Sequence, residues 1–215
     1  MGFHDELDTV LAACAQVARR TGEACTRATT ALLDADLELA QQVIAADREI
    51  DMARDDIEER VLELVARHQP VATDLRVVVA ALRMATDLER MGDLAAHVAK
   101  VARRRYPRSA VPSELAAVVM ELGHLNTRMA DLSGGVIASR DVRTAQVVEA
   151  DEDRVDALHR RVLGTILDEG WDDDMDVAVD LVLLGRYYER FGDHCTSLVR
   201  RMVFVATGQH PVRAA

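Results

Sequence analysis

Aromatic residues and prolines are scarce in this sequence of 215 residues. Phe, Trp and Tyr together account for 3% of the chain, and there are only four prolines. β-Sheets are usually enriched in aromatic and β-branched residues, whereas long stretches without proline are typical of helices. Because hydrophobic residues reach 49% and are mainly Ala, Val and Leu, we expect an all-α protein made of closely packed helices.

The signatures of common catalytic and redox sites are also missing. There is no glycine-rich phosphate loop, no nucleophile elbow, no HExxH motif and no CxxC pair. The sequence therefore predicts a protein that is not an enzyme. The three cysteines, Cys14, Cys25 and Cys195, are scattered along the chain, and we expect them to be buried, reduced thiols.

The charge balance and the hydropathy exclude two further classes of protein. The net charge is −11, whereas nucleic-acid-binding proteins normally present a basic face. No apolar run approaches the roughly 18 residues that a membrane span needs, and the acidic N-terminal sequence is unlike a signal peptide. We therefore expect a soluble, cytoplasmic protein that neither binds nucleic acid nor inserts into a membrane.

Six long segments carry apolar residues at spacings of three and four, which predicts amphipathic helices. We expect Asp34–Asp36 to form a turn with a cap, and Thr73 and Ser113 to cap the helices that follow them. The predicted helices cover roughly residues 3–33, 37–67, 73–106, 113–139, 143–169 and 175–207.

A polar break between Pro107 and Pro112 divides the chain into two similar halves. Each half contains three long helical segments with short connections, a pattern typical of antiparallel bundles. We predict two tandem three-helix bundles, one formed by residues 1–107 and the other by residues 108–215.

An acidic motif repeats between the halves, because Glu89-Arg90-Met91-Gly92-Asp93 recurs as Glu189-Arg190-Phe191-Gly192-Asp193. Two carboxylates four residues apart lie on the same face of a helix. The second helix of each half carries a related pair, so each half has two pairs on neighbouring helices. These additional pairs are Asp47 with Asp51, and Glu152 with Asp156.

Four carboxylates on adjacent helices would repel one another and raise one another's pKa unless cations lie between them. Oxygen-rich clusters suit Mg, Ca, Mn, iron and, in part, zinc. Because the pairs repeat in register beside Gly92 and Gly192, we favour a metal site in each half, with His97 as a further ligand one turn after Asp93. The alternative is that neighbouring arginines neutralise the acids through salt bridges between helices. Those arginines are Arg48, Arg90, Arg154 and Arg190.

Nearly the whole chain resembles the PhoU family, regulators of bacterial phosphate uptake. In the first half the resemblance rests on Asp47–Asp51, Gln69–Arg76 and Asp87–Asp93, and in the second half on Glu149–Asp156 and Arg186–His194. It implies two three-helix bundles with iron or zinc clusters. The implied ligands are Asp47, Asp51, Glu89 and Asp93, with His97 as an addition, in one site, and Glu152, Asp156, Glu189 and Asp193 in the other.

The resemblance also implies a function. PhoU-like proteins restrain phosphate uptake and the phosphate-starvation response by linking the ATPase subunit of the phosphate ABC transporter to a sensor histidine kinase. We expect such a non-enzymatic adaptor, with enough apolar helix surface to form a homodimer. One alternative is a carboxylate-bridged di-metal oxidase or metal store, although Glu121-x-x-His124 provides only one of the two motifs that such a site needs. Another alternative is a helical scaffold whose acids pair with arginines.

Overall fold

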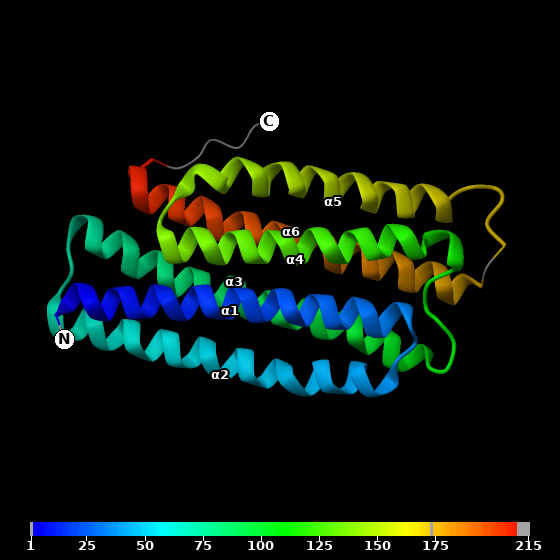
Figure 1. Cartoon of the computed structure of the whole chain (residues 1–215), viewed down its shortest axis with the longest axis horizontal. Helices are drawn as coiled ribbons and strands as arrows, with labels where there is room; N and C mark the ends of the chain where they lie inside the picture. Colours follow the sequence, from blue (N-terminus) through cyan, green and yellow to red (C-terminus); the bar gives the residue numbers. More distant parts are fainter. Residues whose placement is uncertain (1, 173, 210–215) are drawn as a thin grey trace.

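The computed structural model describes residues 2–172 and 174–209, and it confirms an all-α protein (Figure 1). No strand occurs in these residues, and a short 3₁₀ helix (Val142–Thr144) precedes α5. None of the helices that they contain is long and apolar enough to cross a membrane. The six helices are α1 (Phe3–Leu33), α2 (Leu37–His68), α3 (Ala72–Arg105), α4 (Ser113–Ser139), α5 (Ala145–Ile166) and α6 (Met175–Thr207).

Of the three caps that the sequence predicts, one is confirmed and two are wrong. Asp36 caps α2 as predicted, because its side chain accepts a hydrogen bond from the Leu39 backbone N–H (3.0 Å). The predicted cap at Thr73 is wrong: α3 already begins at Ala72, and the Thr73 hydroxyl accepts from Arg76 instead (2.9 Å). The predicted cap at Ser113 is also wrong, since Ser113 is the first residue of α4 and follows Pro112, whose fixed φ suits a helix start.

The predicted fifth helix is too long at both ends. The chain runs through the 3₁₀ helix before α5 begins at Ala145, and α5 ends at Ile166 rather than near Glu169. Asp141 organises this entry, because its carboxylate accepts a hydrogen bond from the Arg143 backbone N–H (3.0 Å). The side chain thus stabilises a turn where periodicity alone predicts helix.

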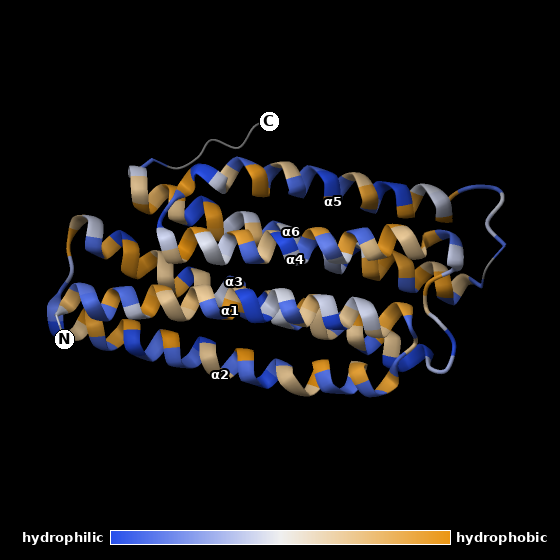
Figure 2. Cartoon of the chain, in the orientation of Figure 1, coloured by the Kyte–Doolittle hydropathy of each residue, from blue (hydrophilic) through white to orange (hydrophobic). Residues whose placement is uncertain are grey.

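Four helices form the interior of the molecule, and two lie outside it. Each inner helix packs along two others, since α1 and α6 both contact α3 and α4. By contrast, α2 touches only α1 and α3, and α5 touches only α4, α6 and the 3₁₀ helix. Figure 1 shows α2 and α5 on opposite sides of the molecule. Figure 2 shows apolar and polar residues alternating along every helix, as partial burial requires.

The outer helices bury narrow apolar stripes. In α2 the buried residues Val43, Ile50, Ile57 and Leu64 recur every seven positions, and in α5 the same spacing relates Val148, Val155 and Val162. A seven-residue repeat keeps one seam of a helix against its neighbour, as in coiled coils. Each outer helix is therefore attached to the inner four along a single line of side chains.

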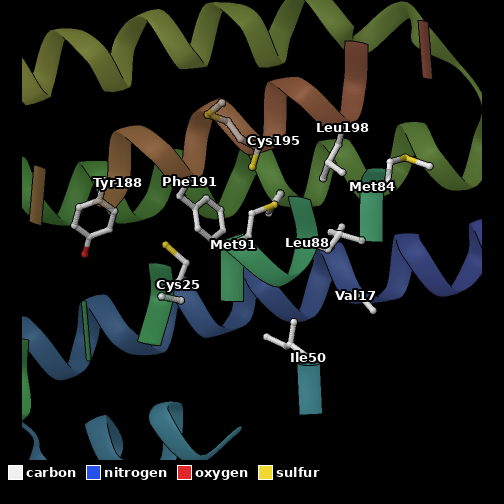
Figure 3. Packing of buried hydrophobic residues seen from close by; sticks show 14 of the residues in the cluster. Val17, Cys25, Ile50, Met84, Leu88, Met91, Tyr188, Phe191, Cys195 and Leu198 are labelled. Atoms are coloured by element: carbon white, nitrogen blue, oxygen red, sulfur yellow. The ribbon is translucent and has the colours of Figure 1, made fainter. Parts of the chain in front are cut away.

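One continuous hydrophobic core joins the two halves of the chain and includes buried residues from all six helices. The contact between α1 and α4 is the most extensive of any helix pair. Helices α1–α3 belong to residues 1–107 and α4–α6 to residues 108–215, and the core crosses this boundary, so the division into two domains stays a prediction. Figure 3 shows the meeting of side chains from α1, α3 and α6, among them Cys25, Leu88, Met91, Phe191 and Cys195.

The three cysteines are buried and unpaired, as predicted. Burial raises the pKa of the Cys14 and Cys25 thiols to about 12. A thiol with such a pKa stays protonated and unreactive at neutral pH. The cysteines therefore act as small apolar side chains in the core.

A buried hydrogen bond ties α1 to α6 beside the α1–α4 contact. The Thr29 hydroxyl donates to the Cys25 carbonyl and lies 2.8 Å from the Tyr188 hydroxyl. Thr29 also packs on Gly123 of α4, where an added Cβ would lie 2.6 Å from Thr29 Oγ1. Glycine at position 123 is therefore needed for α4 to approach α1 this closely.

We predict that Gly123→Ala lowers the free energy of unfolding by about 1–3 kcal/mol, because the new methyl group forces apart side chains that already fill the space. The matched control is Gly135→Ala in the same helix, where an added Cβ meets no atom within 4 Å. That change should raise the free energy of unfolding by roughly 0.5–1 kcal/mol, since alanine is the better helix former. Urea unfolding of the three proteins measures both effects, and equal destabilisation by both substitutions would contradict the packing argument.

Candidate functional site

The first acidic cluster lies where outer helix α2 meets α3. Asp47 and Asp51 are on α2, and Glu89 and Asp93 are on α3. Burial raises the pKa of Asp47 to about 6, and the charges of Asp93, Asp51 and Glu89 add to this shift, against a smaller opposing effect of Lys100. The structure therefore places the four carboxylates that the sequence predicts to share a site near enough to affect one another's charge state.

Asp47 is the most constrained member of this first cluster. Its Oδ1 atom is buried and accepts no hydrogen bond from any described residue. It also sits directly over Gly92, where an added Cβ would lie 2.9 Å from it and 3.0 Å from Ile50 Cδ1. Glycine in the motif therefore allows α2 to lie close to α3, and it leaves a buried carboxylate oxygen without a partner, which is costly unless a proton or a cation satisfies it.

The second cluster repeats this arrangement between α5 and α6. Burial raises the pKa of Glu152, although the neighbouring Thr196 hydroxyl and the charge of Arg200 oppose the effect. Burial also raises the pKa of Asp156, and the charges of Glu189 and Asp193 add to it. The four predicted carboxylates of the second half thus come together as well.

The two motif glycines have different roles. Gly192 faces α4, where an added Cβ would meet Asn126 Oδ1 at 3.5 Å and the Met129 side chain at 3.6 Å. These are ordinary van der Waals distances, so Gly192 is not needed for close approach of α5. The repeated glycine marks a tight carboxylate site only in the first half.

The arginines next to the acids neutralise part of the acidic charge, but they do not reach Asp47. Arg90 contacts Asp93 (3.1 Å) and Glu89 (3.5 Å), and Arg190 contacts Asp193 (3.0 Å). These pairs lie within one helix rather than between helices, and both guanidinium groups are about half exposed (59% and 45%). Exposed pairs of this kind contribute little. Neither they nor any other ion pair in the described part of the chain engages Asp47.

The other two arginines that were candidates for neutralising the acids do not reach the clusters. Arg154 pairs with Glu121 (2.7 Å) and Asp151 (3.3 Å), and Arg48 makes no ion pair with a described residue. Glu189 instead pairs with Arg186 (2.6 Å), one turn earlier in α6. Among the described residues, the four predicted arginines therefore form no salt bridge between helices to the clusters. Arg200 of α6, which was not predicted, does approach one cluster carboxylate, with its Nη2 3.8 Å from Glu152 Oε2 on α5.

His97 and His159 occupy different positions relative to the clusters. The His97 ring contacts the Asp93 carbonyl oxygen through Nδ1 (2.7 Å) and packs on Tyr187 of α6 at 5.2 Å between ring centroids. It lies at the α3 edge of the first cluster and would have to turn to join the carboxylates. His159, by contrast, places Nδ1 3.3 Å from Glu189 Oε2 and is largely buried.

His159 is a candidate ligand that the sequence reasoning missed. Its ring packs on Gly185, where an added Cβ would lie 2.8 Å from His159 Cδ2. The signal was present, because His159 follows Asp156 by three residues and so shares its helix face. The second cluster therefore contains four carboxylates and one imidazole.

The donor set fits a hard or borderline cation, but the side chains are not in coordinating positions. Within the described residues no group of three or more His, Cys, Asp or Glu side chains is arranged to hold a metal ion. The chemistry of the cluster nonetheless suits one: four carboxylates converge, and one buried oxygen lacks a partner. Coordination would require exposed ends such as those of Asp51 and Asp156 to turn inward.

A family model and known proteins match nearly the whole chain. The family model described as the PhoU domain matches residues 15–102 and again residues 119–202. The phosphate-specific transport system accessory protein PhoU homolog 2 of Mycobacterium tuberculosis is 39% identical over 209 residues, covering 97% of this chain and 98% of that protein. PhoU homolog 1 of Mycobacterium leprae is also 39% identical and covers 97% of this chain and 94% of its own length.

Solved structures share the fold. The crystal structure of PhoU from Pseudomonas aeruginosa matches with a TM-score of 0.84 at 26% identity, over 97% of this chain and 100% of that chain. The phosphate transport system regulatory protein PhoU from Streptococcus pneumoniae gives the same TM-score at 23% identity, over 98% and 100% of the two chains. The six-helix architecture is therefore that of these proteins.

We predict that Asp47→Asn stabilises the metal-free protein at neutral pH but not in acid. The folded state binds a proton at Asp47 with a pKa of about 6, against about 3.8 for an ordinary aspartate. Between these values the folded protein holds more protons than the unfolded chain, so its stability falls as the pH rises and the penalty is complete above about pH 6. Urea unfolding in EDTA at about pH 7.5 and about pH 4 should show a gain for the variant only at the higher pH.

The control for this comparison is Asp56→Asn at an exposed position of the same helix. It removes the same charge from α2 without touching the cluster. If Asp47→Asn changes stability no more than this control at either pH, the buried carboxylate does not oppose folding.

Proposed function

Because this chain belongs to the PhoU family, we propose that it is a non-enzymatic regulator that restrains phosphate uptake and the phosphate-starvation response. The observation that carries the proposal is the extent of the similarity, 97% of this chain and 98% of a relative named as a phosphate-specific transport system accessory protein. The relatives are named for accessory or regulatory roles, not for a reaction.

The partners that we propose are the ATPase subunit of the phosphate ABC transporter and the cytoplasmic part of a sensor histidine kinase. An adaptor between two proteins needs surface that is open to each of them. The first two turns of α6 offer apolar side chains to such contacts: Met175, Val179 and Val182 are 77%, 51% and 41% exposed. The same kind of surface supports a homodimer, and the proposed location is the cytoplasm.

We further propose that each acidic cluster binds a metal ion, with iron or zinc first and Mg, Mn or Ca as alternatives. A bound cation would neutralise the carboxylates and thereby hold each outer helix against the inner four. The unpartnered Oδ1 of Asp47 supports the first site, and the proximity of His159 to Glu189 supports a nitrogen ligand in the second. The proposed ligands are Asp47, Asp51, Glu89, Asp93 and His97, and Glu152, Asp156, Glu189, Asp193 and His159.

An oxidase or metal-storage role is not favoured. Such a site needs two Glu-x-x-His motifs on facing helices. The chain has one, and its Glu121 is held by Arg154 at 2.7 Å. The carboxylate clusters therefore fit a structural or regulatory metal better than a redox centre.

We expect the double variant Glu89→Gln/Asp93→Asn to lose the metal of the first cluster, about half of the bound metal if both clusters are filled. Elemental analysis of protein purified without an affinity tag measures it. The matched control is Glu59→Gln/Glu63→Gln, an acid pair with the same spacing on the exposed face of α2, which should leave the metal content unchanged. Equal metal in wild type and in the cluster variant would show that these carboxylates hold no cation.

The regulatory role is tested in cells. In a strain without a second gene of this family, deletion should raise transcription of phosphate-starvation genes in phosphate-rich medium, because the restraint on the response is lost. A copy of the wild-type gene should restore repression. Unchanged repression after deletion would count against the proposed role, whatever the metal content of the protein.

A further inference from the structure

Four arginines surround a groove between the N-terminal part of α3 and the C-terminal part of α6. The groove has a volume of about 250 Å³, and no acidic residue lines it. This concentration of positive charge is unusual in a protein with a net charge of −11. The arginines are Arg76 and Arg83 from α3, and Arg200 and Arg201 from α6.

Of the four arginines in the groove, only the two from α6 form ion pairs with carboxylates of the described residues. Arg201 donates from Nε to Asp87 Oδ2 (2.9 Å), and Arg200 donates to Glu149 Oε1 (3.1 Å). The arginines of α3 have no acidic partner among the described residues. Arg76 donates only to the Thr73 hydroxyl (2.9 Å).

The α3 side of the groove also contains donors without acceptors. The Nε atom of Arg76 is buried and has no hydrogen-bond partner in the described part of the chain. Arg83 is exposed and makes neither a hydrogen bond nor an ion pair with a described residue. A buried guanidinium nitrogen without an acceptor is costly, and the two side chains together offer planar sets of donors to an incoming anion.

The opposite end of the same helix pair shows what such an arrangement can hold. There the buried carboxylate of Asp180 accepts hydrogen bonds from Arg104 and Arg105, near the C-terminal end of α3. The helices repeat at an offset of one hundred residues, as Glu89 and Glu189 do. At this offset the counterpart of Asp180 is Ala80, which lines the arginine groove.

One end of the α3–α6 pair therefore has its own carboxylate between arginines, and the other end has a methyl group and an open space. The two ends of the helix pair correspond in position, but their arginines do not correspond residue by residue. Arg200 and Arg201 lie one helical turn before the counterparts of Arg104 and Arg105. In both cases arginines near the end of one helix face the first part of the other. The difference is that Asp180 pairs with both arginines at its end, whereas at the groove Asp87 and Glu149 pair only with the arginines of α6, and Arg76 and Arg83 have no carboxylate partner among the described residues.

We propose that the groove between α3 and α6 binds a phosphate-type oxyanion, inorganic phosphate or pyrophosphate, in the place that Asp180 fills at the other end. Arginine donors pair with phosphate oxygens through strong, charge-assisted hydrogen bonds. The apolar side chains of Val79 and Ala80 form part of the wall. The inference rests on the groove alone and does not depend on the proposed metal sites or on the proposed regulatory role.

The test is isothermal titration calorimetry of the full chain with inorganic phosphate, pyrophosphate and sulfate. Wild type should bind phosphate or pyrophosphate, and Arg83→Gln should weaken the affinity roughly tenfold, because it removes a charged donor. Ala80→Asp should abolish binding, since the new carboxylate occupies the groove. The control Arg161→Gln removes an exposed arginine of α5 and should bind as wild type does.

Titration with the three different anions distinguishes the possible ligands. Binding of inorganic phosphate assigns a free-phosphate site, and binding of pyrophosphate alone assigns a site for condensed phosphates. Sulfate that competes equally indicates recognition of the tetrahedral oxyanion in general, which also supports the proposal.

Absence of binding to wild type up to ~10 mM phosphate and pyrophosphate would overturn the proposal. So would equal binding to wild type and to a folded Ala80→Asp variant. If circular dichroism shows that Ala80→Asp does not fold, the exposed position of Arg83 keeps the test intact, and an unchanged affinity of Arg83→Gln then counts as the contradiction. Metal content and repression in cells are measured separately, so their failure and the failure of this site can be told apart.

Discussion

The outer helices α2 and α5 pack on the inner four along contacts that contain clustered carboxylates. The repulsion between these carboxylates is the constraint on which the rest of the structure depends. Helix α2 is attached by one apolar stripe, and the same seam contains four acidic side chains, of which Asp47 is buried deeply enough to raise its pKa to about 6. Hydrophobic packing draws the helix inward while like charges oppose it. A proton, a cation or a movement of α2 would each relieve the conflict, so this seam is the part of the fold most responsive to its surroundings.

Both halves of the internal repeat have a cluster of four carboxylates beside an outer helix, but the surroundings of the two clusters differ. Gly92 admits the Asp47 carboxylate against α3, whereas Gly192 packs on α4 and plays no such part. The second cluster has His159 beside Glu189, and the first has His97 turned toward Tyr187. Two sites with the same acids therefore differ in close approach and in the position of their nitrogen donors, which is a physical basis for different affinities in the two halves.

Much of the fold follows from periodicity, but the details of the site do not. The spacing of apolar residues predicts α1 and α6 from end to end, because a long amphipathic stripe has one way to be buried. The acids at Asp47 and Glu89 could be grouped because helix geometry fixes which residues share a face. The sequence did not reveal that Arg90 and Arg190 pair within their own helices, or that His159 reaches Glu189, because rotamers and the approach of a neighbouring helix decide those contacts.

The charged groups lie at two kinds of helix–helix contact. The carboxylate clusters lie between an outer helix and its own half, at α2–α3 and α5–α6. The arginine groove and the Asp180 pairs lie between α3 and α6, where the two halves meet. A cation would therefore tighten each half, whereas an anion would tighten the contact between the halves. Because α3 and α6 contribute to both kinds of contact, the proposed cation sites and the proposed anion site would be linked through the same two helices.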